Sequence, residues 1–553
     1  MATVSARIVS ALQPAASEVF GVMGNGNAHF LDAVMAAPDT FHYTAVRHEA
    51  GAVAAADAYF RAAGRLAVAT TTYGAGFTNA LTPLAEAVQA DIPLVLVVGD
   101  TPTSGRRPWD VDQVRIAAGL GAPTFTVSAE HVLAETTAAV EHALRHRTPV
   151  VLAIPYDLAG VEASDEDQPG AVRPAVLPLP AEGNLERVAA VLTAAERPLV
   201  LAGRGAWISG AQGAATKLAE HLGALTATSG LGAGFFGDHP SSLGIAGGWA
   251  SERTAQLIAE ADVVLVLGAR LNQFTTRFGH AFGGSAHVIQ VDVADAPTSA
   301  VVTDHLRGDA RAIAEALTDV LIGTPAAGHT AARWSDVAAV RALLSHDARE
   351  DGDALAADGR LDPRSLCRAL DGMLPADRTI VQDGGHFIGW APGYLRVPAP
   401  NRLIMVGTAY QTIGLGFPSA VGAARALPAS TLVLCTGDGG GLMALADLDS
   451  FIRTARRAVI VVFNDAAYGA EIHQYAVRGI HSGPMMIDEV DFAALATALG
   501  ATGRTIRTLQ DLDGVAGWLA SDDDGVLLLD CKISQQVVAP YMQEIVAVAT
   551  GAK

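Results

Sequence analysis

The chain is poor in cysteine, aromatic residues and positive charge, and these shortages exclude several classes of protein. Its 553 residues include three widely separated cysteines, so we expect neither a disulfide framework nor a cysteine metal site. Lysine and arginine total 37 against 57 acidic residues, and the net charge of −20 argues against a nucleic-acid or anionic-membrane partner. No apolar run reaches the roughly 20 residues of a membrane span, and the amino terminus lacks a secretory pattern. We therefore expect a cytoplasmic protein.

Short apolar runs alternate with stretches of helical spacing along the whole chain. Runs such as LVLVV, VVLVL and VIVVF are almost continuously apolar, which is typical of parallel sheets covered on both faces. A proline- and charge-rich linker spans residues 164–183, and a second breaker, GTPAAGHTAARW, starts at Gly323. The sequence therefore predicts three doubly wound α/β domains with mainly parallel sheets, over residues 1–163, 184–325 and 360–553. The first and third should have comparable sheets.

Two aspartates follow neighbouring strands in the segment GDGGGLMALADLDSFIRTARRAVIVVFNDAAYG, residues 437–469. Its pattern predicts a strand, a glycine-rich turn, a helix and a strand, so Asp438 and Asp465 should share the carboxyl edge of a parallel sheet, where ligands bind. Mg²⁺ takes one or two carboxylates together with phosphate oxygens, and glycines allow backbone N–H groups to approach a phosphate. The segment predicts a magnesium–phosphate site, although GDG alone also fits a simple capped turn.

The same segment resembles the thiamine-diphosphate-binding motif, which begins with GDG and ends in Asn-Asn or Asn-Asp. The resemblance implies that Mg²⁺ is bound by Asp438, Asp465 and the carbonyl of Ala467. Here the closing pair is Asn464-Asp465 rather than the commoner Asn-Asn, and a carboxylate remains a suitable hard ligand. The resemblance also assigns cofactor contacts in this segment to Gly439, Gly440, Tyr468 and Gly469.

Two residues of the amino-terminal third are candidate catalytic residues. Glu49, in the segment AVRHEAGAV, stands where an acidic residue favours a helix start. The family resemblance implies that its carboxyl hydrogen-bonds the aminopyrimidine ring of the cofactor and promotes removal of the thiazolium C2 proton. Gln113, in WDVDQVRIAAG, resembles a cofactor-facing glutamine of benzaldehyde lyase and acetolactate synthase relatives. The run Asp112-Gln113-Val114 departs from their F-Q-E pattern, and a surface glutamine remains the alternative.

Further site residues are implied by four other segments that resemble the family, at residues 21–34, 70–87, 381–390 and 407–424, and by the residues that follow Gly469. Ile413 would wedge between the two cofactor rings, and His386 would approach the diphosphate; a core isoleucine and a structural histidine are the alternatives. The cofactor-binding set is completed by Thr72, Gly384, Gly385 and Gln411. The residues expected around the substrate are Asn25, Gly26, Phe77, Ala470 and Glu471.

The resemblance covers essentially the whole chain and implies a pyrimidine-binding, a central and a diphosphate-binding domain. In the family the cofactor lies between two subunits, so we expect a homodimer or homotetramer in which Glu49 of one chain meets Asp438 of another. The expected activity is a thiamine-diphosphate- and Mg²⁺-dependent 2-oxoacid decarboxylase and carboligase resembling acetolactate synthase. The alternatives are a hydroxyketone lyase of the benzaldehyde lyase type, a 2-hydroxyacyl-CoA lyase, or a non-catalytic paralogue.

Substrates would accordingly be a 2-oxoacid, an aldehyde or an acyl-CoA. The central segment GARLNQFTTRFG, residues 268–279, also resembles acyl-CoA lyase relatives that hold a nucleotide in this domain. The sequence leaves open whether FAD, ADP or nothing binds there.

Overall fold

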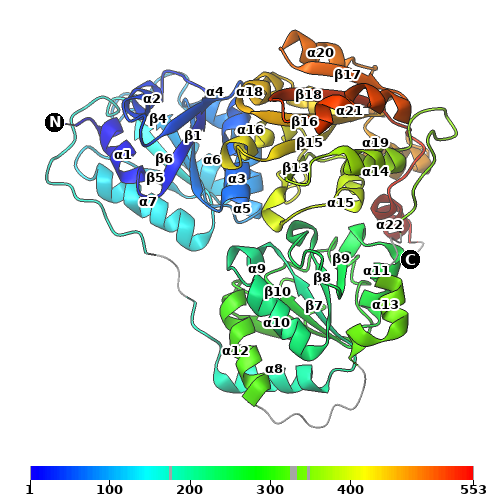
Figure 1. Cartoon of the computed structure of the whole chain (residues 1–553). Coiled ribbons are helices and arrows are strands. Elements are labelled where there is room, and N and C mark those ends of the chain that lie inside the picture. The colour runs from blue at the N-terminus through cyan, green and yellow to red at the C-terminus, as the bar shows by residue number, and fades with distance from the viewer. Residues whose placement is uncertain (1, 174–176, 324–332, 345–348, 552–553) are drawn as a thin grey trace.

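Three six-stranded sheets, each with exclusively parallel pairing, form the framework of the chain (Figure 1). The computed structural model describes residues 2–173, 177–323, 333–344 and 349–551. The α/β prediction with parallel sheets is confirmed. The domain limits stay predictions, and most of the second predicted breaker, residues 324–332, lies outside the described residues. No helix within the described part of the chain is long and apolar enough to cross a bilayer.

The first sheet has the strand order β2-β1-β3-β4-β6-β5. Strands β3, β4 and β6 are buried at every position, which is why their sequences are continuously apolar rather than alternating. The strands are β1 (Ala16–Gly21), β2 (His42–Ala45), β3 (Leu66–Thr71), β4 (Val95–Asp100), β5 (Thr124–Thr126) and β6 (Val150–Pro155). The helices are α1 (Val4–Leu12), α2 (Ala28–Met35), α3 (Glu49–Ala63), α4 (Ala75–Asn79), α5 (Leu81–Gln89), α6 (Gln113–Leu120) and α7 (Val132–His146).

The third sheet repeats this arrangement, with the order β14-β13-β15-β16-β18-β17. Counted from its own first strand, each of the two sheets has the order 2-1-3-4-6-5. The first and third sheets are therefore comparable, as the sequence predicts. The strands are β13 (Arg378–Gln382), β14 (Leu403–Met405), β15 (Thr431–Gly437), β16 (Arg457–Asn464), β17 (Thr502–Ile506) and β18 (Gly525–Lys532). The helices are α14 (Pro363–Met373), α15 (Ala391–Tyr394), α16 (Gly416–Ala426), α17 (Asp438–Met443), α18 (Ala446–Thr454), α19 (Gly469–Tyr475), α20 (Phe492–Ala498), α21 (Asp513–Ala520) and α22 (Pro540–Ala549).

The central sheet has a different order, β12-β11-β10-β7-β8-β9. Counted from its own first strand this is 6-5-4-1-2-3, the order that creates a ligand crevice between the first and fourth strands. The strands are β7 (Pro198–Ala202), β8 (Leu225–Thr228), β9 (Ser242–Ile245), β10 (Val263–Leu267), β11 (His287–Asp292) and β12 (Asp304–Arg307). The helices are α8 (Glu182–Ala194), α9 (Arg204–Ile208), α10 (Gln212–Leu222), α11 (Glu252–Ala259), α12 (Ala310–Gly323) and α13 (Ala338–Leu344).

Helices α3 and α16 join the first and third sheets into one body (Figure 1). One continuous hydrophobic core contains buried residues from both, including Ala55 of α3 and Phe417 of α16. Small residues allow this close approach: a Cβ atom on Gly422 would lie 2.0 Å from the carbonyl oxygen of Ala55. The packing fixes the carboxyl edges of the two sheets relative to each other within the chain.

Candidate active site

Two buried carboxylates lie at the carboxyl edge of the third sheet. Asp438 begins α17 directly after β15, and Asp465 follows β16. One oxygen of Asp438 accepts the N–H of Gly439 at 2.9 Å, while Oδ2 has no hydrogen-bond partner within the described part of the chain. Burial raises the pKa of Asp438 to about 6, against the lowering effect of N–H groups in residues 439 and 466–467. Burial and the adjacent Asp438 carboxylate raise the pKa of Asp465 to about 8. A bound cation would relieve this repulsion.

Glycines and a third aspartate shape the backbone around this pair. A Cβ atom on Gly440 would lie 2.7 Å from Asp383 Oδ2, so a side chain at that position would fill the space. Asp383 is completely buried and accepts N–H groups from Gly384 at 2.7 Å and Gly414 at 3.0 Å, and the hydroxyl of Thr436 at 3.1 Å. Burial raises the pKa of Asp383. Its side chain thus connects the loops after β13 and β14 with the carboxyl end of β15.

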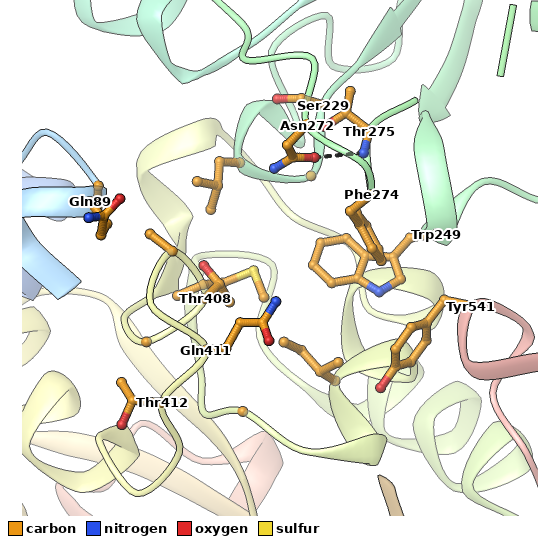
Figure 2. A pocket seen from close by; sticks show the side chains of 18 of the residues that line it. Gln89, Ser229, Trp249, Asn272, Phe274, Thr275, Thr408, Gln411, Thr412 and Tyr541 are labelled. Atoms are coloured by element: carbon orange, nitrogen blue, oxygen red, sulfur yellow. Dashed lines mark hydrogen bonds between the residues drawn. The ribbon is translucent and has the colours of Figure 1, made fainter. Parts of the chain in front are cut away.

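A cavity of about 1000 Å³ opens from the carboxylate pair toward the central domain. In Figure 2, Thr408 and Gln411 lie across it from Ser229 and Asn272 of the central domain. Every predicted site residue of the carboxyl-terminal domain lines this cavity, and their contacts with a cofactor stay predictions. They are Gly384, Gly385, His386, Gln411, Ile413, Asp438, Gly439, Gly440, Asp465, Ala467, Tyr468, Gly469, Ala470 and Glu471.

His386 is held as a neutral ring beside the carboxylate pair. Its Nε2 accepts the backbone N–H of Ala539 at 2.9 Å, which leaves the ring proton on Nδ1. Burial and the neighbouring His473 lower the pKa of His386 to about 3. Nδ1 of His386 faces Gly469: a Cβ atom added to Gly469 would lie 3.6 Å from Nδ1. The ring is therefore suited to donate one hydrogen bond toward the glycine-lined end of the cavity.

The predicted site residues of the amino-terminal domain gather at the carboxyl edge of the first sheet, away from this cavity. Glu49 begins α3, is half-buried, and accepts a hydrogen bond from Asn79 Nδ2 at 3.0 Å. Thr72 Oγ1 accepts the N–H of Gly26 at 2.9 Å. Phe77 is fully buried in the shared hydrophobic core, and its place near the substrate stays a prediction.

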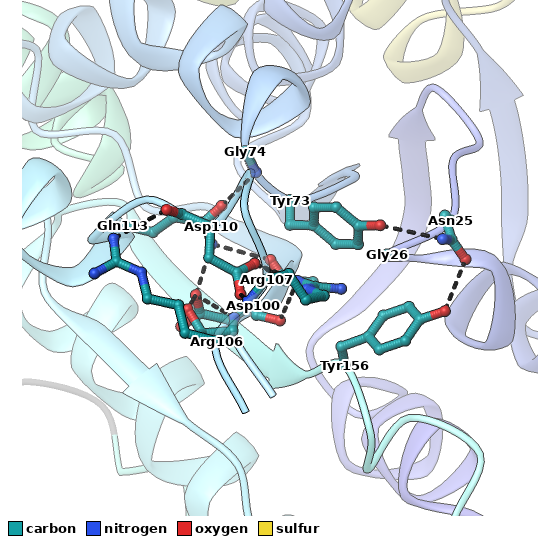
Figure 3. A network of polar contacts seen from close by, with 12 residues as sticks. Asn25, Gly26, Tyr73, Gly74, Asp100, Arg106, Arg107, Asp110, Gln113 and Tyr156 are labelled. Atoms are coloured by element: carbon teal, nitrogen blue, oxygen red, sulfur yellow. Dashed lines mark hydrogen bonds and ion pairs between the residues drawn. The ribbon is translucent and has the colours of Figure 1, made fainter. Parts of the chain in front are cut away.

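Both the oxygen and the nitrogen of the Gln113 side-chain amide form hydrogen bonds inside the first domain (Figure 3). Its Oε1 accepts the N–H of Gly74 at 2.7 Å, and its Nε2 donates to the carbonyl of Gly99 at 2.9 Å and to Asp100 at 3.1 Å. The side chain is buried. Contact with a cofactor stays a prediction, and in this structure Gln113 joins the loop after β3 to the carboxyl end of β4.

A tyrosine pair beside this glutamine fixes Asn25 (Figure 3). Asn25 donates to the Tyr73 hydroxyl at 3.1 Å and accepts from that of Tyr156 at 3.4 Å. The Arg107 guanidinium lies over both rings, 4.0 and 4.5 Å from their centroids, and pairs with Asp110 at 2.6 Å. This group has no continuous sequence signal, since its members come from four separate loops.

Comparison with known proteins identifies the chain. Three thiamine pyrophosphate enzyme families match it in order: the N-terminal TPP binding domain at residues 2–117, the central domain at 185–317 and the C-terminal TPP binding domain at 383–531. The chain is a thiamine pyrophosphate enzyme. The chain is similar to acetolactate synthases, as the sequence motifs indicate.

Individual relatives of this thiamine pyrophosphate enzyme span nearly its whole length. A sulfoacetaldehyde acetyltransferase of Alcaligenes xylosoxydans xylosoxydans is 29% identical, over 90% of this chain and 86% of the relative. The acetolactate synthase isozyme 3 large subunit of Escherichia coli is 27% identical, over 91% and 89%. A thiamine diphosphate-dependent 4-hydroxybenzoylformate decarboxylase of Rhodococcus jostii shares the fold, with a TM-score of 0.77, 21% identity, and coverage of 96% and 99%.

The residues of the enzyme fit thiamine diphosphate (thiamine pyrophosphate) and a hard cation. Asp438 offers an unpartnered buried oxygen, and the described residues contain no group of three or more histidine, cysteine or acidic side chains placed to hold a metal ion by themselves. Mg²⁺ prefers one or two carboxylates as ligands, with the other coordination positions filled by carbonyl, water or phosphate oxygens. Sequence reasoning found this pair but missed Asp383, whose partners lie 31 and 53 residues away along the chain.

Proposed function

We propose that this thiamine pyrophosphate enzyme is a Mg²⁺-dependent 2-oxoacid decarboxylase and carboligase of the acetolactate synthase type. The observation that carries the proposal is the buried Asp438–Asp465 pair, with one unpartnered oxygen, at the glycine-lined end of a large cavity. The relatives named acetolactate synthase and sulfoacetaldehyde acetyltransferase support carbon–carbon bond formation or transfer rather than decarboxylation alone.

Each part of the site has a separate task in this proposal. Asp438, Asp465 and the carbonyl of Ala467 would hold Mg²⁺, which would supply positive charge for the diphosphate. When bound, thiamine diphosphate supplies a nucleophilic carbon and an electron sink for breaking a bond next to a carbonyl group. Glu49, oriented by Asn79, holds a proton at the aminopyrimidine ring. Asn25, fixed between its two tyrosines, presents an amide to the substrate.

The active unit in this proposal is a homodimer or a dimer-based homotetramer. Glu49 does not line the cavity that contains Asp438 in the same chain, so one chain leaves the two halves of the site apart. Large apolar side chains are exposed on loops and short helices of both domains, and clustered exposed apolar groups are typical of interfaces. On the first domain they are Met23, Trp109, Val111, Val114 and Tyr156, and on the third Tyr410, Met443, Tyr475, Val477, Ile480 and Met486.

The central end of the cavity favours a second candidate, a 2-hydroxyacyl-CoA lyase. Arg204 is partly buried, its Nη2 donates to the carbonyl of Ala90 at 2.7 Å, and its buried Nη1 has no partner among the described residues. Burial, followed by repulsion from Arg61, lowers the pKa of Arg204 to about 9. A phosphate group would satisfy the free guanidinium N–H, and the crevice between β7 and β10 suits a nucleotide. The occupant would be the ADP portion of FAD, ADP itself or an acyl-CoA.

The first experiment identifies small molecules released from the purified, denatured enzyme after incubation with thiamine diphosphate and Mg²⁺. An activity assay with pyruvate is run beside it. One thiamine diphosphate per chain, together with CO₂ release and a new carbon–carbon bond in the product from pyruvate, supports the first candidate. Cleavage of a 2-hydroxyacyl-CoA without CO₂ release supports the second. Retained FAD fits the acetolactate synthase type, and retained ADP or CoA fits the lyase. Failure to retain thiamine diphosphate would contradict both.

A further inference from the structure

A buried ion cluster lies between the first domain and the cofactor loop of the third. Arg61 of α3 pairs with Asp57 of the same helix at 2.5 Å and with Glu86 of α5 at 3.1 Å. All three side chains are almost inaccessible to solvent, with exposed fractions of 3% for Arg61 and 0% for both carboxylates. Both oxygens of Asp57 are used by Arg61. Glu86 uses only Oε1 for this ion pair.

The second oxygen of Glu86 reaches across the domain boundary. Its Oε2 accepts the backbone N–H of Tyr410 at 2.6 Å, a contact between residues 324 positions apart. Tyr410 lies in the loop of residues 407–413, which lines the cavity and carries Gln411 and Ile413. A hydrogen bond from an N–H group to a carboxylate is short and strong, because the acceptor is charged.

The loop adopts a conformation that requires support. Gln411 has a φ of +57°, in the left-handed region that non-glycine residues rarely adopt. The loop is closed by the N–H of Thr412, which donates to the carbonyl of Gly407 at 2.9 Å. Gln411 lies in the cavity next to this closure (Figure 2). Tyr410, whose N–H donates to Glu86, comes immediately before Gln411 in the chain.

We propose that Glu86 is a positioning residue for the cofactor, which holds the loop of residues 407–413 in its binding conformation. The inference rests on the proposed role of this loop in binding thiamine diphosphate. The two oxygens of Glu86 have different tasks: Oε1 balances the charge of Arg61, and Oε2 orients the loop. Asp57 performs only the first task, so it provides a matched control within the same ion cluster.

The test compares Glu86→Ala, Glu86→Gln and Asp57→Asn in the full chain. The dissociation constant of thiamine diphosphate is measured by quenching of tryptophan fluorescence at saturating Mg²⁺, alongside the melting temperature. Glu86→Ala should weaken cofactor binding by about tenfold or more, the usual effect of losing a hydrogen bond to a charged group. Glu86→Gln keeps an acceptor oxygen for the N–H of Tyr410 and should restore most of the affinity. Asp57→Asn should lower the melting temperature without weakening cofactor binding.

Equal melting-temperature losses in Glu86→Ala and Asp57→Asn, with unchanged cofactor affinity in both, would overturn the inference and leave Glu86 as a structural ion pair. If Glu86→Ala does not fold, Glu86→Gln decides, because it keeps the acceptor oxygen for the N–H of Tyr410. A Glu86→Gln variant that binds thiamine diphosphate more than about tenfold more weakly than the wild type would also overturn the inference. A wild-type chain that binds no thiamine diphosphate would instead contradict the proposed function.

Discussion

At the scale of single residues, Glu49 provides the sharpest test of the proposed chemistry. Its carboxyl accepts a hydrogen bond from Asn79 at 3.0 Å, and Glu49→Gln keeps both the size and an acceptor oxygen while losing the ability to carry the proton. We expect exchange of the C2 proton of thiamine diphosphate with deuterated water, followed by NMR, to slow by about 10² or more. Cofactor retained per chain should stay the same. Exchange at the wild-type rate in this variant would contradict the assignment.

The residues that sequence analysis identified share a local signal, and those that it missed do not. Asp438 and Asp465 are recognisable because each ends an apolar strand within one segment. Glu86 and Asp383 act on backbone groups far along the chain, so no spacing rule reveals them. Gln113 also follows from a local resemblance, and its cofactor contact stays a prediction; its hydrogen bonds to Gly74 and Gly99 could not be foreseen from spacing.

At the scale of secondary-structure elements, the α3–α16 contact should be sensitive to single methyl groups. A Cβ atom on Gly422 would lie 2.0 Å from the backbone oxygen of Ala55, and backbone moves less readily than a side chain. Gly422→Ala should therefore lower the free energy of unfolding by about 1–3 kcal/mol, measured as a lower melting temperature by calorimetry.

A glycine elsewhere in the chain supplies the control for this prediction. Gly517 lies on the exposed face of α21, and nothing stands within 4 Å of a Cβ atom added there. Gly517→Ala should raise the free energy of unfolding by about 0.5–1 kcal/mol, because alanine loses less backbone entropy in a helix. A stabilising effect of alanine at both positions would show that α3 and α16 do not pack as closely as described.

The types of elements were predictable from periodicity, and their spatial order was not. Continuous apolar runs correctly indicate buried parallel strands, since both faces of each sheet are covered. The position of β5 at the edge beyond β6, or of β17 beyond β18, depends on tertiary packing of the crossover helices. The same holds for the close contact of α3 with α16, which joins segments more than 350 residues apart in the sequence.

At the scale of the whole molecule, the proposal requires that each active site combine two chains. Within one chain, Glu49 lies at the edge of the first sheet and Asp438 lines a cavity that Glu49 does not reach. The shared core between α3 and α16 holds these two edges in fixed positions, so movement within a chain would have to break that core. In this proposal, a second copy of the chain would complete both sites by symmetry.

This arrangement predicts complementation between two inactive variants. Glu49→Gln and Asp438→Asn should each abolish product formation as homodimers. Co-expressed at equal levels, half of the dimers are mixed, and each mixed dimer has one intact site and one doubly altered site. The preparation should therefore recover about a quarter of wild-type activity per chain. Co-expression of Glu49→Gln with Glu49→Ala is the control, because every site then lacks the glutamate and no activity should return. If the first pair also stays inactive while size-exclusion chromatography shows mixed dimers, Glu49 and Asp438 do not meet across a subunit interface.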